Sequence, residues 1–365
     1  MVAVGGFASV IPARRLLRIA AGLVLVGVEV ALVAPHVSRG GTALGNLNWG
    51  WVAAAIACEV ASVATYGRLR RRLLSAGGVQ LPLGRMGALA AASSAMTATI
   101  PAGAAVAGGY LYRQFRRLGA SAPLAVWTVS AAAVVSGLAF SVLTMVGTVL
   151  DGDDSLAGVV GAGGLSLVLV VGLIGGLMLV TRHPRPIVTR LRAMCARLPG
   201  RRSRDCAGAP DVDAVVAQLS AIDPRARDWA AAFWFAAVSW AADLACFVMC
   251  CYAVGVGSLG AGVAVLAYVA GLATSSLTLL PGGIGTVEAG FMVGLAHAGV
   301  TAPLAVAGIL TYRVVAYGLV ALVGWTVWAL LRRGRAAEGR DADVVVETIS
   351  EPATAEPTLA PVTAA

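Results

Sequence analysis

The sequence contains no lysine and few charged residues of any kind, so its 27 basic side chains are all arginines. Charged residues make up 12% of the 365 residues, whereas hydrophobic residues make up 59%. A water-soluble domain carries about 25% charged and about 45–50% apolar residues. Because so little charge cannot cover the surface of a soluble protein of this length, the composition excludes soluble enzyme folds and nucleic-acid-binding domains for the chain as a whole. It predicts an all-α integral membrane protein.

Histidine and cysteine are also scarce. The three histidines are far apart, and the six cysteines form no C-x-x-C pair, which is the usual spacing of zinc ligands. We therefore expect reduced, structural cysteines, no metal site and no cofactor. The net charge of +9 would suggest nucleic acid as a partner of a soluble protein, but here the arginines cluster between apolar runs, so we expect no nucleic-acid partner.

Six apolar runs are long enough to cross a membrane, which takes about 20 residues. They are 16–35, 49–67, 122–150, 155–181, 229–254 and 302–331. Two further apolar stretches, 79–117 and 259–299, are broken near the middle by Pro101 with Gly103 and by a Pro-Gly-Gly-Ile-Gly run. Proline and glycine interrupt helices, so each stretch predicts a helical hairpin that either re-enters the membrane or spans it twice.

The arginines predict the orientation of these segments. Clusters at 14–18, 68–72, 113–117, 182–227 and 332–335 fall on one side if each broken stretch enters and leaves by the same face. Since arginine-rich loops stay in the cytoplasm, we expect a multi-pass protein of the plasma (inner) membrane with both termini cytoplasmic. The membrane domain then covers 1–333, with a basic cytoplasmic loop at 182–228, and 334–365 form a disordered cytoplasmic tail.

An internal repeat relates the two broken stretches at an offset of 180 residues. Pro101 matches Pro281, Gly103 matches Gly283, and an A-P-L-A-V run recurs at 122 and 302. Serines precede both prolines, Ser94 in the first copy. The orientation makes the repeat halves, about 49–150 and 229–331, run in opposite senses. That is an inverted-topology repeat, an architecture of secondary transporters whose broken helices meet near the membrane midplane.

Ionisable residues inside apolar spans are functional candidates, because each costs about 2.5–3.5 kcal/mol on insertion. The chain has five: Glu29, Glu59, Asp243, Glu288 and Arg313. Four carboxylates against one arginine cannot all be charged cheaply, so some should hold a proton. Proton coupling through Glu288, Asp243 or Glu59 is therefore a hypothesis; the alternative is a purely structural role.

Arg313 is the candidate receptor of a lipid phosphate, because a guanidinium matches phosphate with a fork of donors. Tyr312 and Tyr317 flank it in the predicted site. The alternative is a structural ion pair of Arg313 with Glu288 or Asp243. The glycines of the two breaks precede helical runs, whose free N–H groups suit a phosphate, although glycine also merely allows close helix contact. These candidates are Pro101, Gly103, Pro281, Gly282, Gly283 and Gly285.

The stretch from Leu280 through the Pro-Gly-Gly-Ile-Gly run to Glu288, followed by Tyr312-Arg313, resembles the membrane region of bacterial lysylphosphatidylglycerol synthases and the wider flippase-like family that shares it. The residues from Thr99 to Ser121 resemble a looser first copy. The resemblance implies a lipid-translocating membrane domain. The candidate site residues of the second copy fall on the family motif: Pro281, Gly282, Gly283, Gly285, Glu288, Tyr312 and Arg313. Two departures stand out: Ala102 occupies a position where the family often has glycine, and no carboxylate follows within 103–109.

We therefore expect a non-enzymatic, flippase-like transporter that moves a phosphate-bearing or anionic lipid, of phospholipid or polyprenyl-phosphate type, between leaflets. No synthase domain follows the membrane part, so aminoacyl transfer is not expected. The alternative is a non-transporting scaffold for a glycosyltransferase or lipid-modifying enzyme, docked through the loop 182–228. A small-solute transporter is a third hypothesis, disfavoured by the low polar content of the spans.

Overall fold

The computed structural model describes residues 47–152, 172, 217–218, 222, 224–275, 283 and 285–333, and these form helices and connecting turns with no strand among them. Four helices are long and apolar enough to cross a membrane: Trp49–Ala76 (α2), Ala122–Leu150 (α5), Ala226–Ala253 (α10) and Ala302–Arg333. They confirm four of the six predicted spans. The other two, 16–35 and 155–181, lie outside the described residues, as do Glu29, almost all of the basic loop and the tail 334–365.

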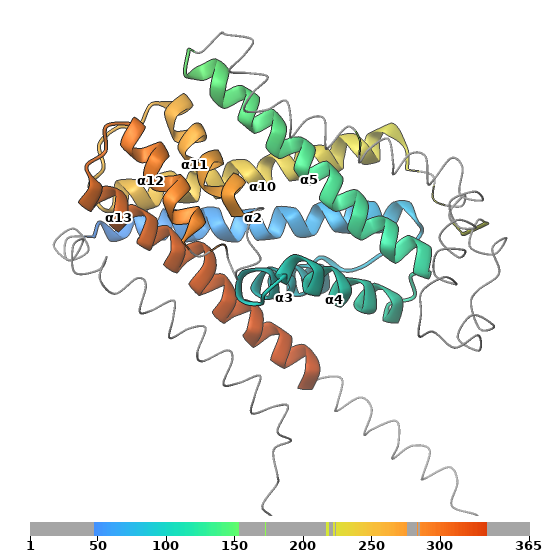
Figure 1. The fold of residues 1–365 in the computed structure, drawn as a ribbon. Helices are drawn as coiled ribbons and strands as arrows, with labels where there is room; N and C mark the ends of the chain where they lie inside the picture. Colours follow the sequence, from blue (N-terminus) through green and yellow to red (C-terminus); the bar gives the residue numbers. More distant parts are fainter. Residues whose placement is uncertain are drawn as a thin grey trace, which may run out of the picture.

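The long helices α2 and α10 pack against each other in antiparallel directions and form the centre of the fold (Figure 1). At one end Asn48 N–H donates to Ala253 O at 2.9 Å, and at the other Arg72 forms an ion pair with Asp228 at 2.7 Å. α2 extends past its predicted end at 67 through the arginines to Ala76. Long arginine side chains can continue a helix out of an apolar layer because they reach toward water.

Each predicted broken stretch is a hairpin of two short helices. The first consists of α3 (Leu83–Thr99) and α4 (Gly103–Arg117), and the second of α11 (Ala261–Ser275) and α12 (Thr286–His297). With 17, 15 and 12 residues, α3, α4 and α12 are each shorter than the roughly 20 residues needed to cross. The first hairpin begins where α2 ends and the second where α10 ends, so the two enter from opposite ends of the antiparallel pair (Figure 1).

The order of long helix, hairpin and long helix occurs twice along the described chain. α5 follows the first hairpin and the helix Ala302–Arg333 follows the second, and the two begin 180 residues apart with a proline in the first turn. The A-P-L-A-V run is thus a helix start, where proline is favoured because its missing N–H is not needed. The last long helix consists of α13 (Ala302–Tyr312), a π-helical segment Arg313–Leu319 and a further helical stretch.

Small residues allow the hairpin arms to approach closely. A Cβ on Gly290 would lie 2.3 Å from Ala270 O, and one on Gly294 would lie 2.3 Å from Ala267 Cα, so α11 and α12 touch backbone to backbone. At the first break, a Cβ on Gly103 would lie 2.5 Å from the carbonyl oxygens of Met96 and Thr97. Glycine is therefore needed at these positions for packing, and Gly103 combines that role with its place at the tip of the hairpin.

Candidate functional site

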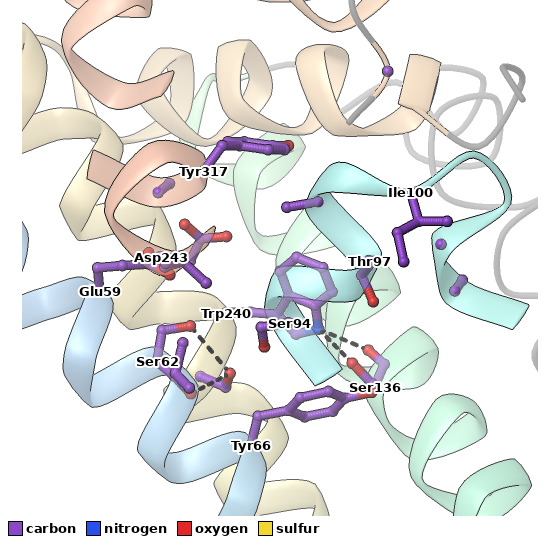
Figure 2. A pocket seen from close by; sticks show the side chains of 18 of the residues that line it. Glu59, Ser62, Tyr66, Ser94, Thr97, Ile100, Ser136, Trp240, Asp243 and Tyr317 are labelled. Carbon is purple, nitrogen blue, oxygen red and sulfur yellow. Dashed lines mark hydrogen bonds between the residues drawn. The ribbon is translucent and has the colours of Figure 1, made fainter. Parts of the chain in front are cut away.

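A cavity of about 660 Å³ lies where the two hairpins meet (Figure 2). Its wall includes Ile100, Ala102 and Gly103 from the first break and Gly283 from the second, and the remainder comes from α2, α5, α10 and the last long helix. The sequence prediction that the two breaks approach each other therefore agrees with the placement of Gly103 and Gly283. Pro101 is exposed at the turn between α3 and α4, whereas Pro281 and Gly282 lie outside the described residues.

The cavity lies at half the length of the long helices. Ser62 is the middle of the 28-residue helix α2 and Ser239 the middle of the 28-residue helix α10, and their hydroxyl oxygens are 3.3 Å apart. Ser136 is the middle of α5, and Tyr317 lies near the middle of Ala302–Arg333. All four residues line the cavity. Helices of this length match the thickness of a membrane, so their midpoints place the cavity near the centre of the apolar layer.

Two carboxyl groups face each other across the central helix pair. Glu59 of α2 is 7% exposed and Asp243 of α10 is half-buried, and their two carboxyl groups lie side by side (Figure 2). Tyr268 donates to Asp243 Oδ2 at 2.7 Å and Tyr312 donates to Asp243 Oδ1 at 2.9 Å. Both tyrosines are almost completely buried. Asp243 is thus held on both oxygens, whereas Glu59 Oε2 accepts no hydrogen bond from the described residues.

Arg313 forms its ion pair with Glu288, at 2.7 Å between Nη2 and Oε1. The guanidinium also lies over the ring of Tyr317, 4.3 Å from the ring centre, and the Arg313 side chain is only 10% exposed. The structural pairing that the sequence left open is therefore with Glu288 and not with Asp243. Tyr312, the expected neighbour of a bound phosphate, turns instead to Asp243, and it is Tyr317 that lines the cavity.

The two helices that begin at the breaks differ in their capping. α12 begins at Thr286 after Gly285, whose N–H donates to Glu288 Oε2 at 2.7 Å. α4 begins at Gly103 after Ala102, and no side chain caps it. The first residues of α4, from Gly103 to Ala105, line the cavity. Because the first turn of a helix has free N–H groups and a partial positive charge, the cavity has one electropositive wall without a countercharge of its own.

Hydroxyl groups and an indole complete the wall, and composition alone did not single out most of them. They are Ser62, Ser94, Thr97, Ser136, Ser239 and Trp240. Trp240 Nε1 donates to Ser136 O at 2.9 Å, so the indole is fixed against α5 (Figure 2). Ser94 was visible as part of the repeat. The position of the other hydroxyl residues is a signal that could have identified them. Small polar residues near the middle of apolar helices usually serve helix packing or ligand contact.

Within the described residues no three histidine, cysteine, aspartate or glutamate side chains come together as a metal site, and the four cysteines in this part are free thiols. The cavity is apolar over much of its wall, with hydroxyls, one carboxyl pair and a helix N-terminus converging on it. Such a mixture of apolar surface and a few oriented polar groups is typical of a site for an amphipathic small molecule.

Comparison with known families agrees with this architecture. The family described as the lysylphosphatidylglycerol synthase TM region matches residues 10–324, which includes both hairpins and all four long helices up to the last turns. A comparison with curated proteins gave no match. The resemblance drawn from the Pro-Gly-Gly-Ile-Gly and Tyr-Arg motifs is therefore confirmed: the chain is a multi-pass membrane protein and belongs to the family of the lysylphosphatidylglycerol synthase TM region.

Proposed function

We propose that this protein is a flippase-like transporter that moves a phosphate-bearing or anionic lipid between the two leaflets. The observation that carries the proposal is the cavity of about 660 Å³ at the middle of four membrane-length helices, bordered by the breaks of both hairpins. A polar chamber at this depth serves little purpose in a protein that only anchors partners. It suits a head group that has to pass through an apolar layer while its lipid tails remain outside.

The proposed mechanism uses the two halves as an inverted repeat. α2 and α10 run in opposite directions, the hairpins enter from opposite ends, and Ser62 and Ser239 meet at the midpoints of both central helices. In transporters built in this way, small movements of one half against the other expose a central site alternately to each side. Here each hairpin would act as the gate of its own leaflet, and the arginine-rich end of α2 would face the cytoplasm of a plasma membrane protein.

We place the lipid phosphate at the N-terminus of α4. Its first turn is uncapped, borders the cavity and has no carboxylate among residues 103–109, whereas the corresponding turn of α12 is occupied by Glu288. Arg313 then serves to neutralise Glu288 and to brace the second hairpin against the last long helix. Loss of that brace would loosen the site, so Glu288, Tyr312 and Arg313 support transport without needing to touch the phosphate.

Reconstitution into liposomes tests this function. The full chain is inserted into phosphatidylglycerol–phosphatidylcholine vesicles that contain a fluorescent phosphatidylglycerol, and the fraction of dye bleached by an impermeant reductant reports movement between leaflets. Thr97→Trp fills the cavity from α3 and should reduce the rate at least about tenfold. Val126→Trp adds the same side chain at an exposed position of α5, near an interface where tryptophan is favoured, and should change little.

The same assay separates transport from the scaffold alternative. A scaffold leaves the labelled lipid in its original leaflet with or without Thr97→Trp, and the proposed function then fails. Deletion of residues 182–216 of the basic loop adds a second comparison and leaves α10 and the Arg72–Asp228 ion pair in place. A scaffold docked through that loop would lose its partner, while a transporter should still move lipid. Equal rates for protein-containing and protein-free vesicles would count against the proposal.

A further inference from the structure

The carboxyl pair at the centre of the fold has no role in recognising a phosphate, since negative charge repels negative charge. Glu59 and Asp243 nevertheless lie side by side in the middle of the apolar layer (Figure 2). Two ionised carboxylates at this place would repel each other strongly and could not hydrogen-bond to each other, because each offers only acceptor oxygens. One of the two groups must therefore hold a proton, and the geometry around them indicates which one.

The hydrogen-bond partners assign the proton to Glu59. Both oxygens of Asp243 accept hydrogen bonds, from Tyr268 at 2.7 Å and from Tyr312 at 2.9 Å, and this stabilises an ionised aspartate. Glu59 Oε2 is buried and receives no hydrogen bond from any donor among the described residues. An ionised Glu59 would thus be a buried anion that lies next to a second anion and receives no hydrogen bond. A protonated Glu59 can instead donate a hydrogen bond to Asp243.

No cation among the described neighbours replaces this proton. The titratable groups that surround Glu59 are phenols and thiols besides the aspartate: Asp243 and Cys250 on α10, Tyr268 on α11, and Tyr312 and Tyr317 on the last long helix. α3 and α5 contribute Ser94, Thr97 and Ser136 to the same cavity. The guanidinium on the last long helix, Arg313, is bound to Glu288. Charge on Glu59 is therefore compensated by a proton and not by a fixed side chain.

We propose that Glu59 is a proton carrier, and that one proton enters and leaves the cavity together with each lipid head group. The inference rests on the proposed function, since it names the energy source of that transport. Glu59 lines the cavity, so the group that holds the proton and the space that holds the head group are continuous (Figure 2).

Like-charge repulsion couples the binding of the proton to the binding of the lipid head group. With Glu59 ionised, the cavity would hold two carboxylates, and an anionic head group would meet strong repulsion in a low-dielectric site. With Glu59 protonated, only Asp243 is charged and its charge is spread over two tyrosine hydrogen bonds. The head group therefore enters when the proton is bound. After release, Glu59 gives the proton to water on the far side, and water that fills the emptied cavity solvates both carboxylates while the protein returns. The lipid then moves toward the more alkaline compartment.

Infrared spectroscopy tests the protonation without any transport. The full chain at neutral pH in dodecyl maltoside, a detergent without carbonyl groups, should show the carbonyl stretch of a protonated carboxyl group, and the difference spectrum between the unmodified chain and Glu59→Gln should show the loss of this band. Glu288→Gln is the matched control and should keep the band, because Glu288 is an ion-paired carboxylate. Absence of the band in the unmodified chain, or its persistence in Glu59→Gln, overturns the assignment.

The liposome assay tests the coupling. With one proton per lipid, a gradient of one pH unit should support an about tenfold excess of the labelled lipid in the leaflet facing the alkaline side, and a protonophore should abolish it. Glu59→Gln should equilibrate the lipid without responding to the gradient. Lipid movement that ignores the gradient in the unmodified chain overturns the coupling but leaves the proposed function intact, whereas no lipid movement at all refutes the proposed function itself.

Discussion

The two hairpins are attached to the same long helix by different chemistry. The second hairpin is held by an ion pair, Glu288 to Arg313 at 2.7 Å, with Glu288 also capping the start of α12. The first hairpin is held by a neutral hydrogen bond, from Trp325 Nε1 to Thr99 Oγ1 at 3.1 Å, and the start of α4 has no side-chain cap. A charged contact is typically stronger than a neutral one, so the second hairpin is the more firmly attached to this helix.

This difference suggests a division of labour between structurally similar elements. The second hairpin uses its charged residues to fix its own position, and its helix N-terminus is occupied by its own carboxylate. The first hairpin leaves its helix N-terminus open to the cavity and is tied more weakly to the last long helix. We therefore expect the first hairpin to be both the ligand-binding element and the more mobile gate. Four substitutions test this comparison, in decreasing order of expected effect.

Replacing Arg313 by methionine should have the largest effect. It leaves the Glu288 carboxylate without a countercharge in a low-dielectric setting, and removal of one partner of a buried pair costs about 3 kcal/mol or more. Adding Glu288→Gln should recover part of that loss, since glutamine can still accept the N–H of Gly285. Unfolding in mixed detergent micelles measures both variants. A double variant that is no more stable than Arg313→Met would show that the ion pair is not what holds the second hairpin.

Ala105→Glu makes the first hairpin resemble the second. Ala105 is the third residue of α4, as Glu288 is the third residue of α12, so the new carboxylate can cap the helix. We expect unchanged or slightly improved stability but an at least about tenfold slower lipid movement, because a negative charge would occupy the proposed phosphate position. Ala105→Gln is the control of nearly equal size. Equal transport rates for the two variants would argue against a phosphate at this helix end.

Ala102→Gly should stabilise the protein by about 1 kcal/mol. Ala102 has a φ of +52°, the one positive φ of a non-glycine residue in the described part of the chain, and this left-handed conformation is strained for any residue with a Cβ. The midpoint of thermal unfolding should rise. A fall would mean that the Cβ of Ala102 makes a contact worth more than the strain.

Trp325→Phe should have the smallest effect, a loss of about 0.5 kcal/mol, because it removes one neutral hydrogen bond to Thr99 while keeping the aromatic ring. If the first hairpin is the more weakly attached gate, Trp325→Phe should change the rate of lipid movement clearly while lowering the free energy of unfolding much less than Arg313→Met does. Thr99→Val removes the other partner and should give the same result. A stability loss as large as that of Arg313→Met would reverse the ranking of the two hairpins.

Much of the architecture was readable in the amino-acid sequence. Apolar length predicted the four described spans, and Pro101 and the glycines predicted the breaks, because these properties depend on local backbone chemistry. The site was only partly predictable. Glu59, Asp243, Gly103 and Gly283 were candidates that the structure brings to one cavity, but Ser62, Ser136, Ser239 and Trp240 were not singled out. A serine in an apolar helix cannot be recognised as a site residue from the sequence, because its role depends on which helices face it.

The sequence by itself determined three things: that this chain is a membrane protein, at which residues its helices begin and break, and which family it resembles. These follow from composition, spacing and short motifs. Only the tertiary structure decided the partners of the buried charges: Arg313 with Glu288, and Glu59 with Asp243 under two tyrosines. The physical reason is that partner choice depends on which helix faces which, and the contacts between α2 and α10 join residues about 180 positions apart in the chain.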